Sequence, residues 1–271
     1  MSHPIVDRKL EFGLFRNLLD STRVKDESIL LLKNESGQGK SRLLHLFETH
    51  CRENRVPVSR VDFKGGSLSP IDVLRSIQTD VRSYFQLKRC SDILNQVISI
   101  PQIQIADNTN VGRSEYTVQT TFNMAPLSIE EQRTRWEMGA QALLEDINEL
   151  SQNGMTCFVV LFDTYEQASE EARKWLSNHI LRMSTPQRIR PLVIVIAGKE
   201  VPNPTGEWEH CHTAINLEPL QLEDWMEYAR LVIGDFQPEQ IKRVYTRHKN
   251  SPLQMATVIN ALAPIGDSHV R

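Results

Sequence analysis

The sequence predicts an α/β protein with a mostly parallel sheet that is covered by helices on both faces. Short, continuously apolar runs, typical of strands buried on both sides, alternate with longer amphipathic segments of helical spacing. Two of these runs end in residues that carry chemistry: Lys40-Ser41 follow one, and Asp163 ends another. Because the carboxyl ends of parallel strands meet at one edge of a sheet, these residues are expected to lie together.

Length and composition limit the possible classes. The 271 residues suffice for one large α/β domain, or for a domain with a small helical appendage. A formal net charge of −3 and a pI near 6.3 give no global electrostatic reason to expect nucleic acid or an anionic membrane as a partner, although a local basic patch would allow nucleic acid. The longest apolar runs, 157–162 and 192–197, are far shorter than the ~20 residues of a membrane helix. Isolated cysteines and the absence of a secretory signal pattern predict a reducing, cytoplasmic compartment.

The elements can be assigned in chain order from their periodicity. Strands are expected at 28–33, 57–63, 157–163, 191–197 and 213–217. Helices are expected after Asp7-Arg8, from Lys40, from Pro70, from Ser128 to about Asn153, after Glu166, and over the three segments that begin near Glu223, Pro238 and Pro252. Strands that alternate with helices predict βαβ units, and the trailing helices predict a helical appendage.

The pattern changes between Val97 and Phe122. Two stretches with alternating apolar residues flank the turn residues 107–110, which predicts a β-hairpin. The hairpin would stand where an α/β unit needs only a connection, so it is expected to be an insertion that projects from the sheet. It would either contact a partner or extend the sheet edge without a further role.

The stretch from Asn34 to Ser41 predicts a phosphate-binding loop. It matches G-x-x-x-x-G-K-[ST] in all but the first position, where Asn34 replaces glycine. Gly37 and Gly39 allow backbone N–H groups to turn inward, and the following helix presents the positive end of its dipole to an anion. Lys40 would then reach the β- and γ-phosphates, and Ser41 would ligate Mg²⁺. Asparagine tolerates left-handed backbone angles, so the replacement is expected to preserve the geometry, and the strand-then-helix context disfavours a chance Gly-Lys-Ser turn.

Further charged residues follow strand ends at the same predicted edge. Asp163 is expected to hold Mg²⁺ directly or through water. Glu166 is the nearest carboxylate that could orient an attacking water, or it favours a helix N-terminus through the dipole. Thr164 follows Asp163 where efficient hydrolases of this class carry an acid, which favours slow hydrolysis. Lys199 either senses the γ-phosphate or is a solvated lysine at a strand end.

These motifs resemble a STAND-type ATPase domain, an AAA-related P-loop group that includes NACHT and NB-ARC modules and prokaryotic signalling and defence proteins. The resemblance covers nearly the whole chain and rests on residues 7–8, 34–41, 162–166, 197–199, 217–220 and 250–253. It implies an ASCE/AAA-like P-loop NTPase fold, with a nucleotide-binding α/β domain at 1–217, the hairpin insertion at about 97–122 and a helical lid subdomain at 218–271.

The same resemblance implies roles for individual residues. Asp7 and Arg8 would line the adenine pocket, and Pro252 would touch the base from a Gly-x-Pro-like motif in which Asn250-Ser251 replaces the glycine-rich lead. Lys199 stands where the family commonly has arginine. The implied cofactors are ATP or ADP and Mg²⁺. The candidate site therefore comprises catalytic Lys40, Glu166 and Lys199, metal-binding Ser41 and Asp163, and nucleotide-binding Asp7, Arg8, Asn34, Glu35, Ser36, Gly37, Gln38, Gly39, Lys40, Ser41, Arg42 and Pro252.

Proteins of this group act as switches: ADP holds a closed form, ATP exchange opens it, and oligomerisation brings effector domains together. The resemblance implies a slow signal-transduction ATPase that forms a homo-oligomer when activated. Because the sequence shows no recognisable effector, winged helix or repeat sensor, its effectors are expected on a longer chain or on separate subunits. Two alternatives remain: a DNA-associated AAA-type loader or transposition ATPase, with a basic channel and salt-sensitive DNA binding, and a nucleotide-binding scaffold that does not hydrolyse.

Overall fold

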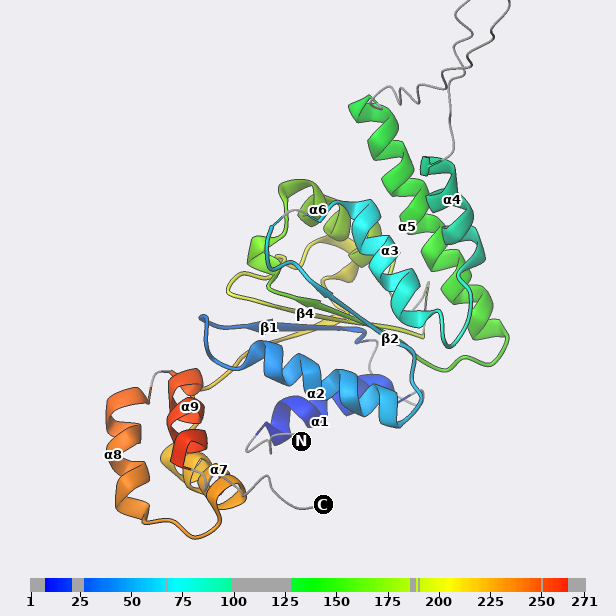
Figure 1. Ribbon diagram of the computed structural model, residues 1–271. Coiled ribbons are helices and arrows are strands. Elements are labelled where there is room, and N and C mark those ends of the chain that lie inside the picture. Colours follow the sequence, from blue (N-terminus) through cyan, green and yellow to red (C-terminus); the bar gives the residue numbers. More distant parts are fainter. Residues whose placement is uncertain are drawn as a thin grey trace, which may run out of the picture.

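The computed structural model describes residues 8–20, 27–66, 68–98, 128–185, 189, 191–249 and 251–262. These residues form a five-stranded sheet flanked by helices (Figure 1). Its strands are β1 (Ile29–Lys33), β2 (Val58–Asp62), β3 (Phe158–Asp163), β4 (Leu192–Gly198) and β5 (His212–Asn216). They lie in the order β2-β3-β4-β1-β5, and every pair is parallel. The predicted α/β fold class is therefore confirmed.

The strand β1 lies inside the sheet, between β4 and β5. Leu32 stands opposite Ala197 of β4 and Ile215 of β5. Successive side chains of β1 alternate between two apolar clusters, one on each face of the sheet, because strand residues point to opposite faces in turn. The loop that follows β1 thus leaves the sheet between the ends of two neighbouring strands.

Helices cover both faces of the sheet. One face carries α3 (Pro70–Val81), α4 (Lys88–Ile98), α5 (Ile129–Gln152) and α6 (Glu170–Trp175), which continues into the π-helical turn η2 (Leu176–Leu181). The other carries α1 (Lys9–Leu19) and α2 (Lys40–Glu53). Capping boxes at Ser69 and Ser128 begin α3 and α5, as the sequence predicts for α5. The two layers bury the sheet, which explains its continuously apolar strands.

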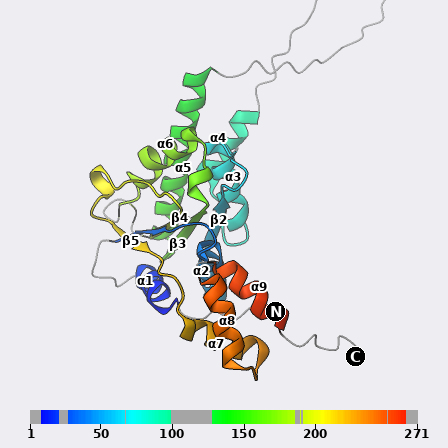
Figure 2. The same ribbon diagram turned by 90° about the vertical axis from the view of Figure 1, so that its left-hand side faces the viewer.

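The helices α7 (Leu222–Ile233), α8 (Pro238–His248) and α9 (Pro252–Leu262) pack on one another. Their shared cluster is separate from the two at the sheet and contains Trp225, Tyr228, Ala229, Ile241, Met255 and Ile259. Figures 1 and 2 place these helices beyond the loop end of the sheet, on the side of α1 and α2. A short connection at 217–221 joins them to β5.

The prediction of a β-hairpin from Val97 is wrong at its start, because Val97 and Ile98 belong to α4. Leu87, Cys90 and Leu94 recur at helical spacing and are buried in the cluster that α5 also joins, so the helix continues through position 98. The rest of the proposed hairpin, residues 99–122, lies outside the described residues. Among the described helices, none has the length and apolar character needed to cross a membrane.

Candidate functional site

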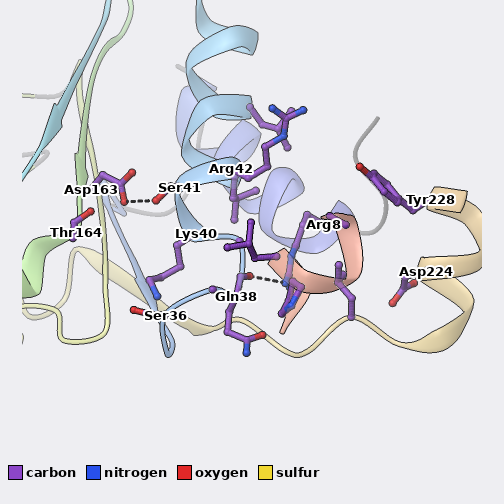
Figure 3. A pocket seen from close by; sticks show the side chains of 18 of the residues that line it. Arg8, Ser36, Gln38, Lys40, Ser41, Arg42, Asp163, Thr164, Asp224 and Tyr228 are labelled. Atoms are coloured by element: carbon purple, nitrogen blue, oxygen red, sulfur yellow. Dashed lines mark hydrogen bonds between the residues drawn. The ribbon is translucent and has the colours of Figure 1, made fainter. Parts of the chain in front are cut away.

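The loop between β1 and α2 has the shape that its glycines predict. Gly37 and Gly39 have φ values of 81° and 87°, in the left-handed region that favours glycine. Gly39 is the N-cap of α2, so the first turn of this helix opens directly on the loop. Figure 3 shows the loop residues Ser36, Gln38 and Lys40 gathered at this helix start. Backbone N–H groups at a helix N-terminus can bind an anion.

Lys40 folds back over the loop. Its Nζ donates to the carbonyl oxygens of Asn34, at 2.5 Å, and of Glu35, at 2.8 Å. The residue is 8% exposed, and burial lowers the pKa of its ammonium group. The nearby carboxylates of Glu166, Asp163 and Glu35 act in the opposite direction on this pKa. Lys40 is thus a cation held among polar groups at the loop.

Asn34 plays a different part from the one expected. The described residues other than glycine with positive φ are Arg55 and Thr164, so Asn34 has no left-handed angle, and its tolerance for such angles is not used here. Its side chain is used instead: Nδ2 donates to the carbonyl oxygen of Leu217, and Oδ1 accepts from the backbone N–H of Glu35 at 2.7 Å. Asn34 therefore ties the loop to the connection that leads toward α7.

Ser41 and Asp163 meet as predicted. The Ser41 hydroxyl donates to Asp163 Oδ1 at 3.0 Å, as the dashed line in Figure 3 shows, and Asp163 is 1% exposed. Mg²⁺ takes oxygen ligands at about 2.05 Å in an octahedron, which places adjacent ligands about 2.9 Å apart. The two oxygens fit adjacent positions of such an ion. Among the described residues, no group of three or more His, Cys, Asp or Glu side chains is arranged to hold a metal, so water and a ligand would have to supply the other positions.

Glu166 reaches the end of β4. Its Oε2 accepts the backbone N–H of Lys199 at 2.9 Å. This approach depends on Thr164, whose φ of 57° is unusual for a β-branched residue and turns the chain sharply after β3. The Thr164 hydroxyl donates to Asp62 Oδ1 at 2.9 Å and holds the turn against β2. The turn thus brings Glu166 to the cavity that the loop also lines.

One cavity of about 660 Å³ connects these residues with the appendage. The residues from Ser36 to Leu43, together with Asp163 and Glu166, line its polar end. The other end is lined by Arg8 and Leu46, by Leu220 of the connection, and by Asp224, Trp225, Tyr228, Pro252, Leu253, Ala256 and Asn260 of α7 and α9. Figure 3 shows Tyr228 and Asp224 facing the loop from α7. A ligand with an anionic end and a flat apolar end matches this division.

Arg8 forms the wall between the loop and the connection. Its Nη1 donates to Glu11 Oε1 at 2.9 Å and to the carbonyl oxygen of Glu218 at 3.0 Å. Its Nη2 donates to the carbonyl oxygen of Gln38 at 3.3 Å, a contact drawn in Figure 3. The side chain is 10% exposed, so this guanidinium is largely committed to protein partners.

The structure brings most of the predicted site residues together, but not all. Asp7 lies outside the described residues. Asn34 and Glu35 belong to the loop but do not line the cavity, nor does Lys199, whose Nζ lies 3.9 Å from Glu35 Oε2. Sequence reasoning missed several lining residues: Lys64, Gln167, Leu220, Asp224, Trp225, Tyr228 and Asn260. Lys64 follows the end of β2, and this position at a strand end could have predicted its place in the site. The missed lining residues of α7 and α9 belong to no chemical motif, so nothing in the sequence predicts their role.

A parallel sheet with a Gly-Lys-Ser loop after an interior strand and an aspartate at the end of another strand is a P-loop NTPase fold. No protein-family model matches the chain, and no curated protein matches it. The fold is similar to that of the Signal Transduction ATPase with Numerous Domains (STAND) protein with a tetratricopeptide repeat sensor from Pyrococcus horikoshii, with a TM-score of 0.55 and 14% identity. The similarity covers 95% of this chain and 30% of that one, so the chain spans less than a third of that protein's length. The ORC1 protein of Aeropyrum pernix, solved in complex with DNA, also matches, with a TM-score of 0.48, 13% identity, and coverage of 96% and 60%.

Proposed function

We propose that this protein is an ATP- and ADP-binding signal-transduction ATPase module that acts as a nucleotide-dependent oligomerisation switch and hydrolyses ATP slowly. One observation carries the proposal: the cavity that begins at the Gly-Lys-Ser loop ends against Trp225, Tyr228 and Pro252 of the appendage. A nucleotide with its phosphates at the loop would place its base there. Such a ligand contacts both parts and so favours the arrangement that it fits best.

The loop would bind the phosphates. The backbone N–H groups from Gly37 to Ser41 and the Lys40 ammonium supply the donors, and Lys40 would exchange its loop carbonyl partners for phosphate oxygens. Ser41 and Asp163 would hold Mg²⁺, which neutralises phosphate charge when it is bound. The helix dipole of α2 adds to the attraction.

The base would lie between the sheet and the appendage. Leu46 and Leu220 form one apolar side, and Pro252 and Ala256 of α9 form another. The Tyr228 hydroxyl donates to Asn260 Oδ1 at 3.1 Å, and this pair brings polar groups to the same region. We propose that Arg8 shapes this wall and does not bind the base directly, since its donors already face protein carbonyls. Asp7, next to it, remains a proposed contact.

Glu166 is our proposed catalytic base, and its setting favours slow turnover. The carboxylate lines the cavity but also accepts a hydrogen bond from the Lys199 N–H. That bond fixes the position of the carboxylate, so it is not free to turn fully toward an attacking water. Lys199 would assist through its backbone, which orients Glu166, while its side chain lies near Glu35.

The appendage would serve as the moving part of the switch. We propose residues 1–217 as the nucleotide-binding domain and 218–271 as a lid. At the connection between them, the side chains of Asn34 and Arg8 donate hydrogen bonds to backbone carbonyl oxygens. The separate apolar cluster of α7, α8 and α9 supports this division, because a part with its own core can move as a unit. The similarity of fold to a signal-transduction ATPase of many domains supports homo-oligomers and effector or sensor partners.

Nucleotide binding by Lys40→Ala tests the proposal. Titrating fluorescent ADP and ATP analogues should show at least about 10-fold weaker binding by this variant, since each lost charged hydrogen bond costs about 1.5–3 kcal/mol. Lys33→Ala is the matched control, because Lys33 is an exposed lysine at the end of β1, outside the cavity, and should bind like the wild type. Light scattering with each nucleotide should show larger assemblies with the triphosphate.

Three results would oppose the proposal in different ways. Binding by Lys40→Ala as tight as wild-type binding would remove the loop from the site. DNA binding with a steep salt dependence would favour a loader. If the wild type binds the triphosphate but does not hydrolyse it, and Glu166→Gln binds the triphosphate equally well, the protein would be a scaffold that does not hydrolyse.

A further inference from the structure

Arg60 of β2 forms an ion pair with the aspartate of the candidate metal site. Its Nη2 lies 2.7 Å from Asp163 Oδ2 and 3.3 Å from the carbonyl oxygen of Ser41. Its Nη1 lies 3.7 Å from Glu48 Oε2 on α2. The Arg60 side chain is 23% exposed and the Asp163 side chain 2%, so the pair lies largely out of water. Neither the loop motif nor the strand-end aspartate predicts such a partner.

Strand register explains how Arg60 reaches this place. Asp62 of β2 stands opposite Asp163 of β3, and Arg60 lies two residues earlier. Residues two apart on a strand point to the same face, so Arg60 lies on the face covered by α2. Its long side chain extends from there toward the sheet edge, where Ser41 lies in the first turn of α2.

The ion pair divides the two oxygens of Asp163 between different partners. Oδ1 faces the Ser41 hydroxyl, in the position that fits a metal, and Oδ2 faces Arg60. Mg²⁺ is attracted by negative charge, and a fixed cation close to its ligand opposes it. The charges of Asp163 and Glu166 are balanced by those of Lys40 and Arg60, so the protein offers little net negative charge there.

We propose that Arg60 competes with Mg²⁺ for Asp163, so that a nucleoside diphosphate binds this site with little dependence on the metal. The proposal rests on the nucleotide site argued above. Arg60 acts here as a positioning residue: it neutralises and orients Asp163 and does not touch the nucleotide. A triphosphate supplies one more phosphate and hence more negative charge, so its binding depends more on Mg²⁺. The metal then distinguishes the two nucleotides.

The test measures how Mg²⁺ changes the affinity for a fluorescent ADP analogue in the full chain. The wild type should show less than about twofold change between EDTA and millimolar Mg²⁺. In Arg60→Gln, millimolar Mg²⁺ should strengthen binding of the ADP analogue at least about 10-fold relative to EDTA, because removing a unit charge a few ångströms from the metal site changes the interaction by at least that much at an effective dielectric constant of about 20. Arg60→Lys keeps the charge and should stay close to the wild type.

Arg52→Gln is the matched control. Arg52 also pairs with Glu48, at 2.6 Å, but it is exposed and has no contact to Asp163 among those described, so its removal should not change the Mg²⁺ response. Arg60→Met serves as a second neutral variant, and thermal unfolding without nucleotide verifies that each variant is folded.

The outcomes separate this inference from the proposed function. A change of less than about twofold between EDTA and millimolar Mg²⁺ in both neutral variants, as in the wild type, would overturn the role of Arg60 while leaving nucleotide binding intact. Failure of the wild type to bind either nucleotide would overturn the proposed function itself. An equally large gain in Mg²⁺ dependence in Arg52→Gln would show a general charge effect and would also overturn the inference.

Discussion

Glu166 approaches the end of β4 more closely than a side chain at position 198 allows. A Cβ built on Gly198 would lie 2.3 Å from the carbonyl oxygen of Glu200 and 2.8 Å from Glu166 Oε2. Both distances are shorter than real Cβ contacts, so glycine is required here by space and not by backbone angle. The same residue therefore permits the bond between Glu166 and the Lys199 N–H.

Gly198→Ala tests this close approach. We expect a loss of about 1–3 kcal/mol in the free energy of unfolding, typical of overpacking in a rigid place, and altered turnover because Glu166 must move. Urea denaturation and steady-state hydrolysis measure the two effects. Gly13→Ala is the control: a Cβ there meets nothing within 4 Å, and alanine favours the helix α1, so its stability should be unchanged or slightly higher. Equal behaviour of the two variants would contradict the argument.

The site residues of the loop and the strand ends could be predicted from the sequence, but their partners and the lining residues of the appendage could not. Lys40, Ser41 and Asp163 follow a motif or a strand end, and the parallel sheet brings them together. Arg60 and Arg8 reach the site through long side chains that no local pattern directs. Their bonds depend on strand register and on how helices pack, which are properties of the folded chain.

At the scale of elements, the loop and the connection at 217–221 form one assembly. The backbone N–H of Leu217 donates to the carbonyl oxygen of Lys33 at 3.3 Å. The Asn34 side chain donates to the carbonyl oxygen of Leu217, and the Arg8 side chain donates to the carbonyl oxygen of Glu218. The departure from the loop motif at Asn34 is therefore not a simple defect. It provides an attachment that glycine cannot make.

Asn34→Gly restores the usual motif and tests this reading. We expect phosphate binding to be retained, because Gly37, Gly39 and Lys40 are unchanged. The connection should loosen, because the bond from Asn34 Nδ2 to the Leu217 carbonyl oxygen and the bond from the Glu35 N–H to Asn34 Oδ1 are lost, each worth about 1 kcal/mol. Hydrogen exchange should then be faster at 217–221 and unchanged in β3. Unchanged exchange at the connection would show that the asparagine side chain is not needed there.

Strands were easier to predict than the connections between them. All five strands lie within about a residue of the expected ranges, because burial on both faces leaves an uninterrupted apolar signal. The helix α4 was missed, and the start of a hairpin was placed on its last turn. Short apolar repeats fit both periodicities, and only the packing of α4 against α5 decides between them.

At the scale of the whole molecule, two clusters hold the sheet to its helical layers and a third holds the appendage. The four cysteines, Cys51, Cys90, Cys157 and Cys211, are buried and form no disulfide, and none belongs to the appendage. Burial raises the pKa of Cys51 and of Cys90 to about 12. These thiols therefore report on opening of the sheet unit alone.

Alkylation of these thiols should be very slow in the folded protein. A pKa of about 12 leaves a thiolate fraction at pH 8 about 1,000-fold below that of a free thiol, and the side chains are inaccessible. Burial of the neutral Cys51 thiol also makes the stability of the fold depend on pH. Because the pKa of this thiol is higher in the folded protein than in the unfolded chain, its contribution to the free energy of unfolding is complete below about pH 9 and is lost as the pH rises toward 12. Iodoacetamide labelling with peptide mass analysis should show protection at pH 8, complete labelling in urea, and faster labelling at pH 10.5. Rapid labelling of the native protein at pH 8 would contradict this burial.

Because the connection between β5 and α7 is short, a ligand needs only weak contacts to the appendage to hold it in place. A tether of a few residues keeps the two walls of the cavity at a high local concentration relative to each other, in the millimolar range for short flexible linkers. A small molecule that bridges them therefore spends little binding energy on bringing them together. Weak contacts to α7 and α9 therefore suffice to bias their position.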